Sequence, residues 1–130
     1  MTGVTFDTGV LIALERASAS QSERRARVVL ANVRRRELRI TVPSVVIVEW
    51  WRGQRGPAAH VLAGMTVEPL DEALARVAGE ALARVKRSPS IVDAVVMASA
   101  ARRGDVVYTA DLADLESLRV AFPTVRVLAV

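Results

Sequence analysis

The stretch VVYTADLADLESL (residues 106–118) joins a short apolar run to leucines at helical spacing. Residues 106–108 are typical of a buried strand, which ends at Thr109. Two acids, Asp111 and Asp114, follow at the predicted start of the helix. They can serve only as caps of this helix, or they can belong to a charged site at the end of a strand. The rest of the chain bears on this choice.

The same order of strand and helix recurs along the whole sequence. Apolar runs predict strands at 3–6, 39–42, 65–70, 106–109 and 125–130. Helical spacing and breaker residues predict helices at 8–16, 22–38, 45–53, 58–63, 72–87, 91–103 and 112–121. Candidate N-caps are Ser44, Asp71 and Ser90, and candidate helix ends are Gly53, Ser88 and Gly104.

The predicted strands are apolar throughout, which is typical of strands that are buried on both sides. Alternating with helices, they indicate an α/β fold with a parallel sheet covered on both faces. In such folds, functional groups gather at the carboxyl ends of the strands, near the point where the strand order reverses. We expect a single domain over residues 1–130, because this length is ordinary for one domain.

Composition excludes several classes of protein. A hydrophobic fraction of 52% supports a real core and argues against disorder. The chain has no cysteine, which excludes disulfides and zinc–thiolate sites. Its apolar runs are too short to span a bilayer, and its start lacks a basic leader, so we expect a cytoplasmic protein with no membrane partner.

The net charge of +4 comes from 18 basic and 14 acidic residues. Lys86 is the only lysine, so the other 17 of the 18 basic residues are arginines. Because arginine makes forked contacts to phosphate, a polyanionic partner fits this composition. A general bias toward arginine explains the same excess, so charge alone leaves both interpretations open.

Four acids lie at or beside apolar segments. Asp7 ends the first predicted strand and Asp111 lies two residues beyond Thr109, so both are expected at the carboxyl ends of strands. Asp93 lies in the first turn of a helix, where Ser90 and Asp93 have the spacing of a capping box. Capping alone therefore explains each aspartate taken singly.

Capping does not explain Glu49, which lies inside the apolar run VVIVEWW. We expect its carboxylate to be buried, where it must be neutralised or paired. Arg52, three residues on, is the only local partner. One arrangement satisfies Glu49 and the aspartates together: all four converge on a hard divalent cation.

Magnesium and manganese prefer carboxylate oxygens and retain bound waters. Such a cation offsets the repulsion within the acid cluster, lowers the pKa of a bound water and stabilises in-line phosphoryl displacement. The one histidine, His60, is expected to be a surface or helix residue. The sequence supports neither a Ser/His/Asp arrangement nor a phosphate-binding loop.

Three segments carry a resemblance to a known family: VTFDTGVLIAL with Asp7, TVPSVVIVEWWRG with Glu49, and SIVDAVVMASAARRGDVVYTADLADLESL with Asp93 and Asp111. In this order and spacing, the chain resembles the PIN-domain nucleases over essentially its whole length. It is most similar to the VapC-like toxins of bacterial toxin–antitoxin pairs. The resemblance implies a three-layer α/β/α sandwich with a mostly parallel central sheet.

The resemblance also implies Mg²⁺- or Mn²⁺-dependent endoribonuclease activity. It carries over an acidic quartet and a frequent additional acid as metal ligands: Asp7, Glu49, Asp93 and Asp111, with Asp114 as the fifth. Thr109 matches a hydroxyl that often lies beside the site. The implied partners are an RNA substrate, a cognate VapB-like antitoxin and a second copy of the chain.

Two rival functions fit parts of the same pattern. A PIN fold without activity would act as an RNA-binding or scaffold module. A signalling receiver domain also clusters acids at strand ends, but it needs a lysine at a late strand end, and Lys86 follows a helix.

Several basic and aromatic side chains are candidates for RNA contacts. The basic candidates are Arg24, Arg25, Arg27 and the run Arg34–Arg36, and a solvated helix face explains them equally well. Trp50 and Trp51 can stack on bases, although we expect at least one of them in the core or at a partner surface.

Overall fold

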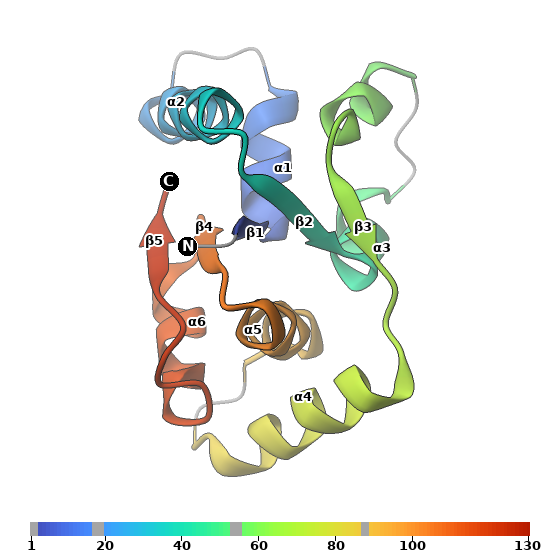
Figure 1. Cartoon of the computed structure of the whole chain (residues 1–130), viewed down its shortest axis with the longest axis vertical. Coiled ribbons are helices and arrows are strands. Elements are labelled where there is room, and N and C mark those ends of the chain that lie inside the picture. Colours follow the sequence, from blue (N-terminus) through green and yellow to red (C-terminus); the bar gives the residue numbers. More distant parts are fainter. Residues whose placement is uncertain (1–2, 17–19, 53–55, 87–88) are drawn as a thin grey trace.

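A computed structural model of the chain describes residues 3–16, 20–52, 56–86 and 89–130. Within these residues, five strands form one sheet in the order β3-β2-β1-β4-β5 (Figure 1), and every pairing is parallel. The strands are β1 (Gly3–Phe6), β2 (Arg39–Pro43), β3 (Thr66–Glu68), β4 (Val106–Thr109) and β5 (Val127–Ala129). The strand order reverses between β1 and β4, so the carboxyl ends of these two strands form a topological switch point.

Helices cover both faces of this sheet. The α-helices are α1 (Thr8–Glu15), α2 (Gln21–Arg35), α3 (Ser44–Trp50), α4 (Glu72–Arg84), α5 (Ile91–Arg103) and α6 (Leu112–Ser117), and the 3₁₀ helices are η1 (Gly56–Leu62) and η2 (Leu118–Val120). Helices α1 and α2 lie on one side of the sheet, and α4 and α5 lie on the other (Figure 1). This arrangement confirms the predicted three-layer α/β/α sandwich.

The differences from the predicted elements lie at the edges of the sheet and at the C-terminal ends of helices. The strands predicted at 65–70 and 125–130 are shorter, because edge strands pair on one side only and leave the sheet early. The segment predicted as one helix at 112–121 divides into α6 and η2. The helices predicted at 22–38, 45–53 and 72–87 end earlier, at Arg35, Trp50 and Arg84, whereas the predicted stop residues Gly53 and Ser88 themselves lie outside the described residues.

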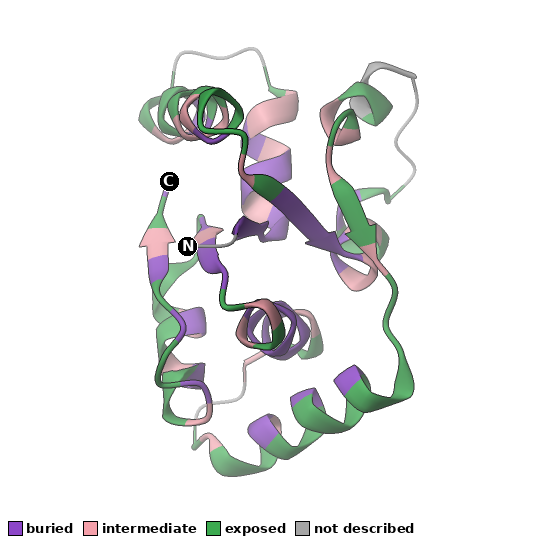
Figure 2. Ribbon diagram, in the orientation of Figure 1, coloured by how far each residue is buried: buried purple, intermediate pink, exposed green. Residues whose placement is uncertain are grey.

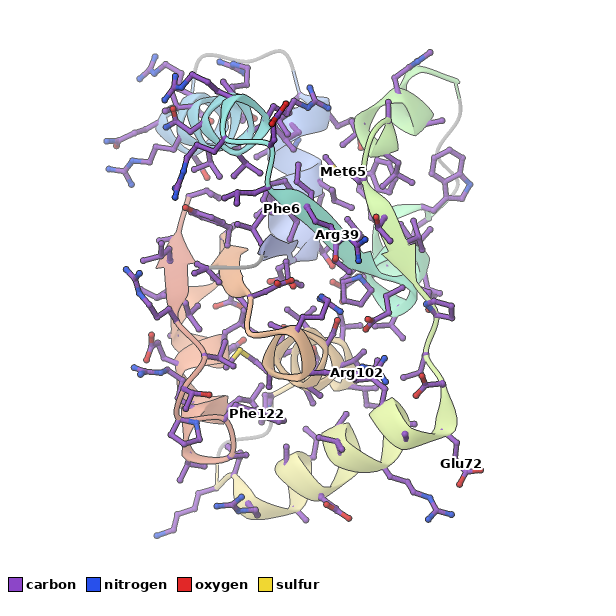
Figure 3. All side chains as sticks on the ribbon, in the orientation of Figure 1. Phe6, Arg39, Met65, Glu72, Arg102 and Phe122 are labelled. Atoms are coloured by element: carbon purple, nitrogen blue, oxygen red, sulfur yellow. The ribbon has the colours of Figure 1, made fainter. Side chains whose placement is uncertain are left out.

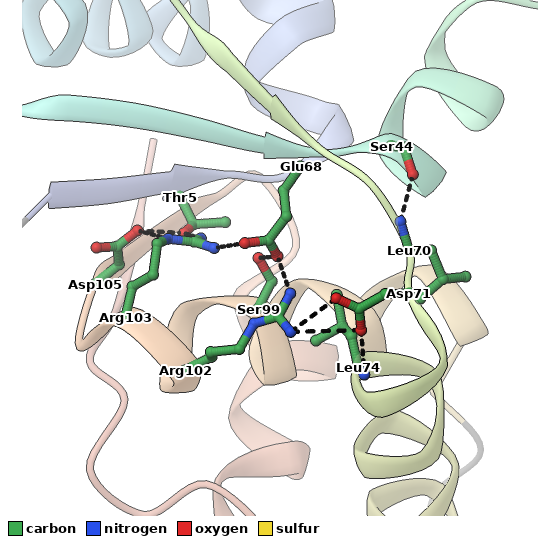
Figure 4. A network of polar contacts seen from close by, with 10 residues as sticks. All are labelled: Thr5, Ser44, Glu68, Leu70, Asp71, Leu74, Ser99, Arg102, Arg103 and Asp105. Atoms are coloured by element: carbon green, nitrogen blue, oxygen red, sulfur yellow. Dashed lines mark hydrogen bonds and ion pairs between the residues drawn. The ribbon is translucent and has the colours of Figure 1, made fainter.

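The predicted cap at Ser44 is wrong. Pro43 is the N-cap of α3 and makes no side-chain capping bond. Ser44 is already helical, and its hydroxyl oxygen accepts the backbone N–H of Leu70 at 3.1 Å (Figure 4). The hydroxyl therefore bonds the chain leaving β3 instead of the orphan N–H groups of its own helix.

Three other predicted helix signals are confirmed, the N-caps Asp71 and Ser90 and the stop at Gly104. The Asp71 carboxylate accepts the Leu74 N–H at 2.8 Å and caps α4. Ser90 and Asp93 form the predicted capping box at the start of α5. Helix α5 ends at Gly104, whose φ of 75° lies in the left-handed region that favours glycine.

The core lies on both sides of the sheet. Phe6 of β1 is fully buried at the centre of the molecule, whereas Glu72 lies at its outer edge (Figure 3). Figure 2 shows burial concentrated in the inner strands β1, β2 and β4 and in α5, where every residue from Ala94 to Ala100 is buried, whereas the edge strand β3 has no buried residue. Among the residues that the structure describes, no helix combines the length and apolar character needed to span a bilayer.

The two tryptophans have different environments. Trp50 is buried in the core at 2% exposure, and its indole N–H donates to Glu15 Oε2 at 2.6 Å. Trp51 is 36% exposed and contacts Trp50 edge-on, with ring centroids 5.4 Å apart. The expectation that at least one of the two belongs to the core is confirmed.

A polar network joins the edge strand β3 to α5 (Figure 4). Arg103 donates to Asp105 Oδ2 at 2.9 Å, to Thr5 Oγ1 at 2.8 Å and to Glu68. Burial raises the pKa of Glu68, but the hydrogen bond from Ser99 and the charge of Arg103 outweigh it, so this pKa lies below its ordinary value. The network replaces the apolar contacts that a short edge strand cannot supply.

Candidate active site

All five predicted acids line one cavity of about 350 Å³: Asp7, Glu49, Asp93, Asp111 and Asp114. Asp7 directly follows β1, and Asp111 lies just beyond β4. The cavity therefore lies at the switch point, where the strand order reverses. A larger cavity of about 400 Å³ lies among residues of α1, α2 and η1 but has only one acid in its wall, so the carboxylates and not the volume identify the candidate site.

Asp7 is the most constrained of these acids. It is 5% exposed and is the N-cap residue of α1. Its Oδ1 accepts the Thr8 N–H at 2.7 Å, and its Oδ2 accepts the Thr109 hydroxyl at 2.8 Å. Burial raises the pKa of Asp7, the two hydrogen bonds oppose this effect, and the nearby charges of Glu49 and Asp111 add to it.

Thr109 connects the two strand ends. Its side chain is fully buried, and its hydroxyl oxygen accepts the Asp111 N–H at 2.8 Å while it donates to Asp7. One hydroxyl therefore holds the carboxylate that follows β1 and the backbone that carries Asp111. The hydroxyl expected beside the site thus lies in contact with Asp7.

Asp93 enters the cavity from α5. Its Oδ2 accepts the Ser90 N–H at 3.3 Å, so the structural interpretation of this acid as part of a capping box is correct. The same residue lines the acid cavity. Burial raises the pKa of Asp93 to about 6, and the charge of Asp7 adds to this shift. Asp93 can therefore cap α5 and line the acid cavity at the same time.

The raised pKa of Asp93 predicts a pH dependence of the metal-free protein. Its ordinary pKa is 3.8, so the folded state binds this proton more tightly than the unfolded chain does. The resulting stability is fully present below about pH 3.8 and is lost as the pH rises through about 6. We expect Asp93→Asn to remove this loss, because the amide does not ionise.

The measurement is the melting temperature of both proteins in EDTA between about pH 4 and 7. As the pH rises, the melting temperature of the wild type should fall relative to that of Asp93→Asn. Parallel curves for the two proteins would contradict the assignment of this proton to Asp93.

The expectation that Glu49 is buried is wrong. Glu49 is exposed and lies one residue before the end of α3. Only Val46 and Trp50 of this helix are buried, whereas Val48 is 75% exposed, so α3 presents an apolar residue to solvent beside Glu49. Water solvates the Glu49 carboxylate, which therefore does not require the pairing with Arg52 that its apolar neighbours suggested.

The donor set of the cavity fits a hard cation. The titratable side chains in its wall are all carboxylates, which magnesium and manganese prefer. Thr8 Oγ1, on a residue that also lines the cavity, is buried and has no hydrogen-bond partner among the described residues. Within the described ranges, however, no three acids gather closely enough to form a ready-made metal site. Binding of a cation would require some of the other acidic side chains to rotate toward Asp7.

Sequence reasoning missed part of the cavity wall. Gly9 and Ala110 line it beside the acids, as do Ile12 and Ser90. The glycine in the motif Asp7–Thr8–Gly9 was the available signal, because glycine is unfavourable inside a helix and a packing or functional reason is then expected. Ala110 has no comparable signal in the sequence.

Two further predicted placements can be compared with the structure. His60 is an exposed residue of η1, as expected. Lys86 is exposed and follows α4, so it does not lie at the end of a strand. The only lysine of the chain is therefore not where a receiver domain would need it, which argues against that rival.

Comparisons with known proteins agree with the fold. The family model of the PIN domain matches residues 4–119. VapC20 of Mycobacterium tuberculosis, a Sarcin-Ricin loop cleaving toxin, is 25% identical with a TM-score of 0.69, over 84% of this chain and 90% of that one. A search of curated proteins gives no match.

Two other solved structures share the fold. FitAcB from Neisseria gonorrhoeae is 16% identical with a TM-score of 0.73, over 96% of each chain. A chain of the DNA-bound VapBC of Salmonella typhimurium is 22% identical with a TM-score of 0.66, over 99% of this chain and 98% of that one. Because the family model spans most of the sequence and the sheet topology agrees with it, the chain belongs to the PIN domain family, with VapC toxins of toxin–antitoxin pairs among its structural neighbours.

Proposed function

We propose that the protein is a Mg²⁺- or Mn²⁺-dependent endoribonuclease and the toxin of a toxin–antitoxin pair. The observation that carries this proposal is the single cavity at the switch point, lined by acids from four separate segments of a PIN domain. The similar VapC20 is described as cleaving the Sarcin-Ricin loop, which makes RNA the first substrate class to test.

The residues of the cavity would have distinct roles. Asp7, Glu49, Asp93 and Asp111 would hold one or two cations, with Asp114 as an additional ligand. When bound, the cation supplies a water of lowered pKa and offsets the charge that develops on the phosphate. Thr109 keeps Asp7 and the Asp111 backbone together, so that a key carboxylate is oriented before substrate arrives.

Positive charge lies at the same edge of the sheet. Arg24 and Arg25 line a cavity of about 390 Å³ together with Ala129 at the end of β5. Because Ala129 is paired with Thr109, these arginines flank the strand ends that carry the acids. They are therefore the preferred candidates for contacts to the RNA backbone, whereas Arg27 and Arg34 line the cavity next to η1.

The neighbouring structures support an antitoxin partner. FitAB and VapBC complexes bound to DNA are among the similar structures. We infer a cognate VapB-like antitoxin for this chain and a homodimer of the toxin, acting in the cytoplasm.

The test is metal-dependent cleavage of a pooled RNA. With Mn²⁺ or Mg²⁺ the protein should convert the pool to shorter fragments, and EDTA should stop the reaction. The same cations should raise the melting temperature by a few degrees, because a ligand that binds only the native state stabilises it.

The rival function predicts a different result. An inactive RNA-binding module would shift the RNA in a gel without cutting it at any metal concentration. Binding without cleavage by the folded protein would therefore reject the nuclease and favour the rival.

A further inference from the structure

Gly9 and Ala110 touch across the wall of the acid cavity. Gly9 lies in the first turn of α1, two residues after Asp7, and Ala110 lies directly before Asp111. A Cβ atom added to Gly9 would lie 2.5 Å from the Cβ of Ala110. Carbon atoms do not approach so closely, and the alanine methyl cannot rotate away because it is attached directly to the backbone. No residue larger than glycine fits at position 9 while Ala110 stays in place.

The clash depends on one methyl group. The other close atoms of Ala110 are its backbone N at 3.4 Å and its Cα at 3.5 Å, which are ordinary contacts for a Cβ. Removing the Ala110 methyl would therefore make room for a methyl at position 9. The two positions are complementary in volume, and this property can be tested by exchanging them.

The contact joins the two segments that carry the acids. The α1 side bears Asp7, and the other side follows Thr109, whose hydroxyl binds Asp7 and the Asp111 N–H. Those hydrogen bonds pull the two segments together, and the contact between Gly9 and Ala110 limits how closely they approach. Both residues line the acid cavity, so a change in this separation changes the cavity itself.

We propose that Gly9 and Ala110 form a spacer that sets the distance between the segments bearing Asp7 and Asp111, with Gly9 as a positioning residue. The consequence for cleavage rests on the proposed nuclease function, whereas the spacer itself does not. A misplacement of about 1 Å costs an enzyme on the order of 100-fold in rate, so a displaced acid should reduce cleavage strongly.

The chain provides a matched control. Gly79 lies inside α4, and a Cβ added to it would meet no atom within 4 Å. Alanine is the better helix former at both glycines. Gly79→Ala should therefore raise the melting temperature and leave cleavage unchanged, whereas Gly9→Ala should lower both.

The experiment compares the wild type, Gly9→Ala, Ala110→Gly, the double variant and Gly79→Ala. We expect Gly9→Ala to lower the melting temperature by about 5 °C and the cleavage rate by about 10- to 100-fold. The double variant should recover the wild-type melting temperature, the Mn²⁺-induced rise in melting temperature and a cleavage rate within about threefold of the wild type. Backbone amide NMR signals of residues 109–111 should shift in Gly9→Ala and return in the double variant.

The spacer and the nuclease can fail separately. The effects of Gly9→Ala and Ala110→Gly on melting temperature and NMR shifts could simply add in the double variant, without a return to the wild-type values. That result would overturn the spacer, whatever the cleavage result. Wild-type cleavage by Gly9→Ala would overturn its positioning role. A wild type that does not cut RNA would reject the proposed function, while the melting temperatures and NMR shifts would still decide the spacer.

Discussion

Asp7→Asn is expected to reduce metal-dependent RNA cleavage by about 100-fold or more, because loss of a ligand should cost at least as much as loss of an outer-shell partner. Both carboxylate oxygens of Asp7 are held in place, by the Thr8 N–H and by the Thr109 hydroxyl. The substitution replaces one carboxylate oxygen by the NH₂ group of an amide and removes a negative charge from the site.

The fold should tolerate this substitution. Burial raises the pKa of Asp7, which means that ionised Asp7 opposes folding at neutral pH. Asparagine has nearly the same shape, still accepts the Thr8 N–H and carries no charge. We therefore expect metal-free Asp7→Asn to melt at or above the wild-type temperature at pH 7.5, and to lose most of the rise caused by Mn²⁺.

Asp71→Asn is the matched control. It makes the same chemical change at the N-cap of α4, where asparagine also caps well. Its cleavage rate and its response to Mn²⁺ should equal those of the wild type. The assignment of Asp7 to the site is wrong if the folded Asp7→Asn protein cuts RNA as fast as this control.

Arg103→Ala is expected to cause the largest loss of stability, about 3–5 kcal/mol in the free energy of unfolding. The Arg103 side chain is 17% exposed, and that of its partner Asp105 is only 3% exposed. Alanine would leave the Asp105 carboxylate buried without the guanidinium. Lysine should not restore the wild type, because a single ammonium group cannot reproduce the forked contacts to Asp105, Thr5 and Glu68.

Urea denaturation measures this effect, and Arg76→Ala is its control. Arg76 forms an ion pair with Glu72 at 2.8 Å, but both side chains are more than three-quarters exposed, at 76% and 79%. Such surface pairs contribute little, so the urea midpoint should scarcely move. Equal midpoints for Arg103→Ala and Arg76→Ala would show that the network does not hold β3 and α5 together.

Local sequence patterns predicted most elements of the fold correctly. The capping box at Ser90 and Asp93 and the stop at Gly104 depend on residues within a few positions of each other, so a single sequence contains the whole interaction. Ser44 was predicted wrongly because its partner, the Leu70 N–H, lies far along the chain. The edge strands were predicted too long for a related reason, since pairing and not composition decides where they end.

The predictions for the acids were also partly right and partly wrong. Asp7 and Asp111 were expected together because a parallel sheet brings the carboxyl ends of its strands to one edge. Glu49 was expected near the aspartates and lines the same cavity, but its exposure was predicted wrongly from its apolar neighbours. Hydrophobic neighbours indicate burial only if the helix face turns inward, and in α3 only Val46 and Trp50 are buried.

The sequence alone determined the fold class of this protein: alternating apolar strands and helices, with acids at strand ends, specify a parallel α/β sheet and the edge at which these acids lie. Only the tertiary structure decided how closely the acidic segments approach, through the Thr109 hydroxyl and the contact between Gly9 and Ala110. The physical reason is the separation along the chain of the residues that interact. Helix and strand preferences arise between near neighbours in the chain, whereas the width of a cavity depends on contacts between segments about a hundred residues apart.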